Sequence, residues 1–507
     1  MRTKLTLLNA LFSVINMVIS SILSLLMTRT VLKFLGSDYN GLNSTISQFL
    51  SVLMLCESGF TLAALVKLYK PYDSKDYAEV NKILSKSRKS LTRIGIIMLL
   101  IGLCLSAIYA FFIQSNVEYA VIFGMFFFSV AATAFNFAYT YKYRLVYQVT
   151  QHEYILHIIS IGQYTVMYLG MMFLVRQTKN ILYARGFYMI MDVAGGLVIG
   201  YVARRKFNFI QFDVECSDVR VEGTKDLFVS KLVGVLYSSL TVFYMSVFSG
   251  TVLTSVYAVY NSVVSIINNF VNTALMAPQN SLGQLINSDR ERAGSIVKEY
   301  EYTAVLMSAV LFSTTMALIV PFIRIYTASI NDVNYIQPAI AVVLILTAVL
   351  QIIHIPSGRC IEMSGDFGAV KKIQLITFLL LATFSVIGGW QMGFMGLLIA
   401  KLLTNVVLAS MEIYYAHTNI LDTGISEYLK VLIPHAVLAC LISTGEYYLL
   451  SQKTLSLPSF FAVAIAIVLL NSLIMFVLGM LCYRNLMNML LTRYSKLLPS
   501  TFARRKQ

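Results

Sequence analysis

Long apolar segments alternate with short polar segments along the whole chain. Each apolar segment is close to the roughly 20 residues that an α-helix needs to cross a bilayer. The pattern predicts an all-α polytopic membrane protein with about fourteen transmembrane helices. They are expected at residues 5–28, 40–66, 94–113, 118–141, 154–175, 181–203, 227–249, 253–277, 301–323, 338–356, 373–390, 394–416, 431–450 and 459–482.

Basic residues are distributed unevenly between alternate connections. With the N-terminus placed in the cytoplasm, the inner segments hold 30 lysines and arginines and the outer segments hold 6. Because cytoplasmic loops retain Lys and Arg, the asymmetry predicts that both termini are cytoplasmic. It also accounts for the net charge of +15, which on a soluble domain would suggest nucleic-acid binding. We therefore expect no nucleic-acid partner.

Polar residues follow single faces of several predicted spans. In the first span Asn9, Ser13, Asn16, Ser20 and Ser24 share a helical face, and in the eighth span Asn261, Ser265, Asn268 and Asn272 do the same. Small polar residues often hold membrane helices together, which is the structural interpretation of each stripe. A hydrated path lined by spans 1, 2, 7 and 8 would explain the stripes together.

Only 12% of the residues are charged, against about 25% in a typical soluble protein, while 58% are hydrophobic. Ionisable groups that remain inside spans are expensive and mark candidate transport sites. The substrate-binding or translocation candidates are Arg29, Glu57, Asp192, Lys231, Asn261, Asn268, Asn272 and Lys401. Static ion pairs between spans are the alternative. Arg185 and Glu412 lie near span ends, so we expect them to extend to water.

The sequence contains no pattern for soluble catalysis or metal binding. The six cysteines form no CxxC pair, the five histidines show no HExxH spacing, and no Walker loop, GxSxG or GxGxxG occurs. We therefore expect no catalytic residues, no metal site and no bound cofactor. An H⁺ or Na⁺ gradient is the candidate driving force for transport.

A weak internal repeat relates spans 1–6 to spans 7–12. Gly36 matches Gly250, and Asn43-Ser44 matches Asn261-Ser262, at offsets of about 214–218 residues. An even number of spans in each half makes the halves parallel. The predicted organisation is an N-terminal lobe at 1–210, a C-terminal lobe at 211–425, spans 13 and 14 at 426–482, and an amphipathic cytoplasmic tail at 483–507.

Residues 27–72 resemble the opening of bacterial polysaccharide-biosynthesis membrane proteins. The matching pieces are Leu35-Gly36, Tyr39-Asn40-Gly41-Leu42 and Glu57-Ser58-Gly59-Phe60, with Pro278-Gln279-Asn280-Ser281-Leu282-Gly283 after the eighth span. These proteins are the Wzx-type flippases of the multidrug/oligosaccharidyl-lipid/polysaccharide exporter superfamily. The layout of fourteen spans extends the resemblance over the whole chain.

The resemblance implies two six-helix lobes around a central cavity, with two further C-terminal helices outside. It implies alternating-access transfer of undecaprenyl-diphosphate-linked oligosaccharide to the outer leaflet of the bacterial inner membrane. Membrane lipids and polysaccharide-assembly proteins are the expected partners. Relatives use cavity cations against the diphosphate, a role that falls by position on Arg29, Lys231 and Lys401.

Two other functions remain open. A cation-coupled drug antiporter of the same superfamily would favour an acidic cavity. The candidate cavity residues here include three cations, Arg29, Lys231 and Lys401, and two carboxylates, Glu57 and Asp192. This balance favours a basic cavity. A membrane polysaccharide polymerase or ligase usually needs a long outer loop with catalytic Arg or His. The longest outer loop, about 324–337, is short and has Arg324 as its only such residue.

Overall fold

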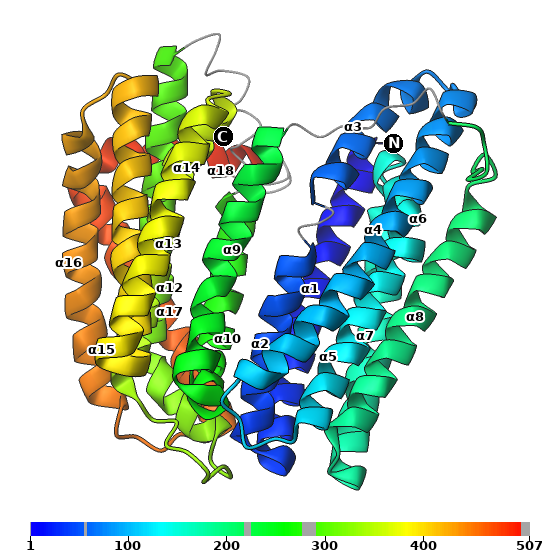
Figure 1. Cartoon of the computed structure of the whole chain (residues 1–507). Coiled ribbons are helices and arrows are strands. Elements are labelled where there is room, and N and C mark those ends of the chain that lie inside the picture. The colour runs from blue at the N-terminus through cyan, green and yellow to red at the C-terminus, as the bar shows by residue number, and fades with distance from the viewer. Residues whose placement is uncertain (1, 55–57, 217–224, 276–289, 498–507) are drawn as a thin grey trace. The chain divides into compact units, whose positions relative to one another are not determined.

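The computed structural model describes residues 2–54, 58–216, 225–275 and 290–497, and all regular secondary structure in these ranges is helical. The chain divides into two compact units. Unit 1 comprises residues 1–258 and 329–333, and unit 2 comprises residues 259–328 and 334–507. Within each unit the helices run side by side (Figure 1). The prediction of an all-α chain is confirmed.

Within its described residues, unit 1 contains ten helical elements and the start of an eleventh. They are α1 (Arg2–Leu35), α2 (Ser37–Leu53), α3 (Ser58–Asp73), α4 (Tyr77–Phe112), α5 (Tyr119–Phe135), the π-helix η2 (Asn136–Thr140), α6 (Tyr141–Val149), α7 (Glu153–Thr178), α8 (Ile181–Lys206), α9 (Lys225–Phe248) and the first turns of α10 (Gly250–Leu275).

Unit 2 contains the rest of α10 and the helices that follow it. They are α12 (Arg290–Tyr326), α13 (Pro338–Ile353), α14 (Ile355–Met363), α15 (Phe367–Tyr415), the π-helix η3 (Ala416–Ile420), α16 (Ile425–Leu450), α17 (Leu457–Cys482) and α18 (Arg484–Leu497). The short helix α18 falls within the predicted amphipathic tail, of which residues 498–507 lie outside the described part.

Eleven segments of the described chain are long and apolar enough to cross a membrane. One of them, residues 367–420, contains two predicted spans. Gly393 interrupts it with φ 57° and ψ −134°. A Cβ atom on Gly396 would lie 2.0 Å from the carbonyl oxygen of Gly388. Residues eight apart are about 12 Å apart along a continuous helix, so the chain reverses at Gly393 and α15 is a hairpin of two spans.

Gly36 and Gly250, matched in the predicted repeat, have the same unusual backbone. Their φ angles are +95° and +78°, and α2 begins directly after Gly36 while α10 begins at Gly250. Only glycine adopts a positive φ without steric cost. The internal match therefore marks an equivalent turn in front of α2 and α10.

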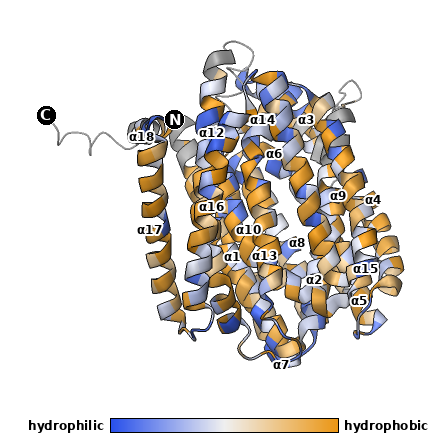
Figure 2. Cartoon of the chain, turned by 90° about the vertical axis from the view of Figure 1, so that its left-hand side faces the viewer, coloured by the Kyte–Doolittle hydropathy of each residue, from blue (hydrophilic) through white to orange (hydrophobic). Residues whose placement is uncertain are grey.

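Apolar surface is abundant, as a bilayer requires. Helix α17 is hydrophobic along nearly its whole length (Figure 2). Its buried residues are Ile467, Asn471, Met475 and Gly479, four residues apart on one narrow stripe. The remaining apolar side chains, such as Leu481 at 78% exposure, would be unstable in water and are suited to lipid. The fold is that of a multi-pass membrane protein.

Candidate functional site

Arg185 of α8 lies inside the helix bundle of unit 1. Its guanidinium donates hydrogen bonds to the side-chain oxygen of Asn43 on α2 and, at 3.2 Å, to Ser129 Oγ on α5. The Nε atom is buried and donates to none of the described residues. The expectation that Arg185 extends to water is therefore wrong, because polar groups on two neighbouring helices hold it inside.

Asp192 lies two turns further along α8 and accepts two side-chain hydrogen bonds. Asn136, the first residue of the π-helix η2, donates to Oδ2, and Gln163 Nε2 of α7 donates to Oδ1 at 3.1 Å. Short π-helical segments often occur at functional sites. Arg185 and Asp192 thus have separate partners, and together they place a cation and a carboxylate in the interior of unit 1.

Asn9 has a structural role that the polar stripe did not reveal. Its Nδ2 donates to the carbonyl oxygen of Gln151 at 3.0 Å, and its Oδ1 accepts from the backbone N–H of Tyr154 at 2.8 Å. Asn9 therefore binds the turn between α6 and α7.

Arg29 is half-buried on α1. Glu57 and the side chain of Lys231 lie outside the described residues.

The other predicted site residues belong to unit 2. Asn268 of α10 donates to Gln351 Oε1 of α13 at 3.4 Å, and its own Oδ1 is buried without a donor among the described residues. Asn261 is half-buried and Asn272 is exposed on the same helix. Lys401 of α15 is only 9% exposed.

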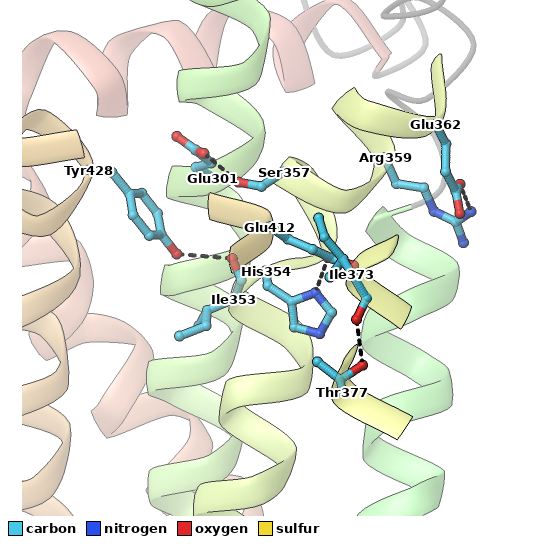
Figure 3. Close-up of polar contacts among 10 residues, drawn as sticks. All are labelled: Glu301, Ile353, His354, Ser357, Arg359, Glu362, Ile373, Thr377, Glu412 and Tyr428. Carbon is cyan, nitrogen blue, oxygen red and sulfur yellow. Dashed lines mark hydrogen bonds and ion pairs between the residues drawn. The ribbon is translucent and has the colours of Figure 1, made fainter. Parts of the chain in front are cut away.

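Unit 2 contains a histidine–carboxylate pair that the sequence did not predict (Figure 3). His354, which separates α13 from α14, lies with Nδ1 2.6 Å from Glu412 Oε2, and the two side chains are 14% and 13% exposed. A Cβ atom on Gly358 would lie 2.5 Å from the same carboxylate oxygen, so glycine leaves room for it. Glu412 is thus paired inside the unit and does not extend to water as expected.

A second pair lies on the neighbouring helices. His417 Nε2 of η3 is 3.0 Å from Glu301 Oε1 of α12, and these side chains are 2% and 4% exposed. Ser357 of α14 also donates to Glu301 Oε1, at 3.2 Å (Figure 3). His417 Nδ1 is 2.8 Å from Thr423 Oγ1. Helices α12 and α14, the π-helix η3 and the loop after it therefore share one polar cluster.

The sequence offered one signal for this cluster. Glu301, His354, Glu412 and His417 all lie at or next to the ends of predicted spans. Within the described residues, no group of three or more His, Cys, Asp or Glu side chains is arranged to hold a metal ion. The arrangement suits proton exchange between histidine and carboxylate.

No family model and no curated protein matches the chain. Solved structures do match it. The lipid II flippase MurJ in an inward closed conformation superposes with a TM-score of 0.70 at 15% identity, covering 94% of this chain and 99% of MurJ. An inward-facing multidrug resistance MATE transporter gives a TM-score of 0.65 at 11% identity, covering 81% and 96%.

A transporter of the MOP superfamily from Pyrococcus furiosus gives a TM-score of 0.56 at 12% identity, covering 81% of this chain and 95% of that structure. These neighbours are membrane transporters or flippases and not enzymes. The likeness defines the fold: the chain has the multi-pass helical fold that these solved structures of MurJ and the MATE transporter share.

Proposed function

We propose that the protein is a flippase for undecaprenyl-diphosphate-linked oligosaccharides. It would move these repeat units from the cytoplasmic to the outer leaflet of a bacterial inner membrane by alternating access, for O-antigen, capsule or exopolysaccharide synthesis. The resemblance of residues 27–72 to polysaccharide-biosynthesis proteins supports the cargo. The structural likeness to a lipid II flippase supports a lipid-linked substrate.

The observation that carries the proposal is an apolar cavity in unit 2. It has a volume of about 430 Å³ and lies among α12, α13 and α16. Val342 and Leu346 at its margin are 38% and 43% exposed, so the cavity borders the membrane-facing surface. Its apolar walls include Val305, Ala309, Phe312, Met316, Ile345 and Leu432. Such a cavity suits a hydrocarbon chain, which a lipid-linked sugar has.

Arg185 of unit 1 has the chemistry to bind a diphosphate. A guanidinium presents several N–H donors and binds phosphate groups bidentately. In unit 1 two of its nitrogens are used by Asn43 and Ser129, while Nε keeps a free donor among the described residues. Arg185 is therefore a further candidate for the diphosphate, beside Arg29, Lys231 and Lys401.

The proposal is tested by deleting the gene in its own host and separating lipid-linked oligosaccharides by leaflet. A flippase predicts repeat units trapped on the cytoplasmic leaflet and loss of surface polysaccharide, both restored by the wild-type gene. Unchanged lipid-linked pools with normal surface polysaccharide would refute it. A drug antiporter predicts that second result together with increased drug sensitivity.

A further inference from the structure

The buried pairs Glu301–His417 and His354–Glu412 share an electrostatic property. With a neutral histidine and an ionised glutamate, each pair carries one net negative charge, which is costly in a low-dielectric interior. One added proton makes each pair neutral overall. Because the Glu301 and His417 side chains are only 4% and 2% exposed, binding and release of that proton changes the charge of the interior itself.

The hydroxyl of Thr423, which contacts the second ring nitrogen of His417, can form a hydrogen bond with both the neutral and the protonated imidazole. His417 Nε2 faces Glu301, and Nδ1 faces the hydroxyl of Thr423 at 2.8 Å. When His417 is neutral with the proton on Nε2, the Thr423 hydroxyl donates to Nδ1. When His417 is protonated on both nitrogens, the same hydroxyl accepts from Nδ1. The site keeps its hydrogen bonds in both states, which a static ion pair does not require.

Water can reach this pair through a small cavity of about 90 Å³. A cavity needs only about 10–15 Å³ to hold one water molecule. Its lining includes Glu301 and His417 and also the ion pair of Lys298 with Glu427, whose Nζ and Oε2 atoms are 2.6 Å apart. The Lys298 and Glu427 side chains are 43% and 58% exposed, so they form the outer end of a proton route.

Other titratable groups surround the pair on each neighbouring element. Helix α12 itself contributes Lys298, Tyr300 and Tyr302, and α16 contributes Glu427, Tyr428 and Lys430. Helix α14 contributes Cys360, which lies close to Glu301. Arg359 and Glu362 form their own pair at 2.6 Å on α14.

We propose that Glu301 and His417 form a proton-binding site, which takes up one proton from the side where Lys298 and Glu427 lie and releases it during transport. A proton is the chemically favoured ligand, because imidazole nitrogens are poor ligands for Na⁺, which binds oxygen. The coupling to transport rests on the proposed function, whereas proton binding itself does not.

Proton binding is tested without substrate by potentiometric titration of the purified full-length protein. The double variant Glu301→Gln/His417→Gln should bind about one proton fewer than wild type between pH 5 and 8. Glu362→Gln is the matched control on α14. Its curve should superpose on wild type, because Glu362 pairs with Arg359 and is not part of the Glu301–His417 pair. Superposed curves for the double variant and wild type would overturn the proposal.

A second variant guards against misfolding of the first. Thr423→Val keeps both titratable groups and removes only the hydroxyl, so it should still bind the proton that the double variant loses. Loss of that proton in Thr423→Val as well would contradict its assignment to Glu301 and His417. Size-exclusion chromatography confirms that each variant remains monodisperse.

Coupling is tested in proteoliposomes that contain an undecaprenyl-diphosphate-linked oligosaccharide. Translocation should increase at least several-fold with an imposed pH gradient, not with a Na⁺ gradient, and Glu301→Gln should lose this response while Glu362→Gln keeps it. Translocation that ignores the pH gradient, or responds equally in Glu301→Gln, would refute proton coupling at this site. An absence of translocation in every condition would instead refute the proposed cargo, and the titration result would stand.

Discussion

Gly41 lies where α2 crosses the start of α10 within unit 1, and its replacement by alanine tests how closely these helices must pack. A Cβ atom there would lie 1.9 Å from the carbonyl oxygen of Thr251 and 2.6 Å from its carbonyl carbon. Ordinary contact begins near 3.4 Å. One backbone would therefore have to move by about 1.5 Å, and no flexible side chain can absorb the shift.

The same crossing is held by hydrogen bonds that such a shift would strain. Asn40 Nδ2 donates to Ser255 Oγ at 2.8 Å, and the backbone N–H of Thr251 donates to the carbonyl oxygen of Gln114 at 3.0 Å. Overpacking typically costs about 1–3 kcal/mol, and the better helix propensity of alanine returns at most about 1 kcal/mol. We expect Gly41→Ala to lower the free energy of unfolding by about 1–2 kcal/mol.

The matched control is Gly162→Ala on α7, also in unit 1. No atom lies within 4 Å of a Cβ atom built on Gly162, so the substitution should be neutral or stabilising by up to about 1 kcal/mol. Thermal unfolding of the purified variants should place Gly41→Ala several degrees below wild type and Gly162→Ala at or above it. Equal midpoints for the two variants would refute the steric argument.

Three further predictions concern the interior and one loop. Asp192→Asn and Lys401→Ala should abolish translocation while leaving a folded membrane protein, and wild-type translocation by both would show that the two side chains are structural. Asn471→Ala removes donors to Ser313 and Thr314, so it should lower the unfolding midpoint by the equivalent of about 1 kcal/mol, and an unchanged midpoint would contradict this contribution. Burial, and secondarily Lys206, lowers the pKa of His152 in the loop before α7. The unfolded state therefore binds more protons, stability should fall as the pH decreases below about 6.5, and His152→Gln should reduce the slope. An equal slope in variant and wild type would refute that assignment.

Helical phase predicts polar stripes on single helices but assigns them no partner. Asn9 lies on the predicted polar face of the first span and binds a backbone turn, while Asn43 of α2 binds Arg185. The spacing of residues along one helix shows which side chains point together. It contains no information about which helix packs against that face.

The histidine–carboxylate cluster shows this limit most clearly. His354 and Glu412 are 58 residues apart, and Glu301 and His417 are 116 residues apart. Glu412 lies near the end of a predicted span, and this position alone predicts that its side chain reaches water. Its pairing depends on the break at His354, on the missing side chain of Gly358 and on the packing of α14 against α15.

The sequence by itself determined the class of protein. The length of the apolar segments and the distribution of Lys and Arg reflect the bilayer, which acts on each residue independently of its packing neighbours. The positive φ angles at Gly36 and Gly250 are also a local property, because only glycine adopts them without steric cost. Only the tertiary structure decided which charges meet. Contacts such as Arg185 with Asn43 and Glu301 with His417 depend on how helices pack, because a buried polar group takes whichever partner the neighbouring helix presents.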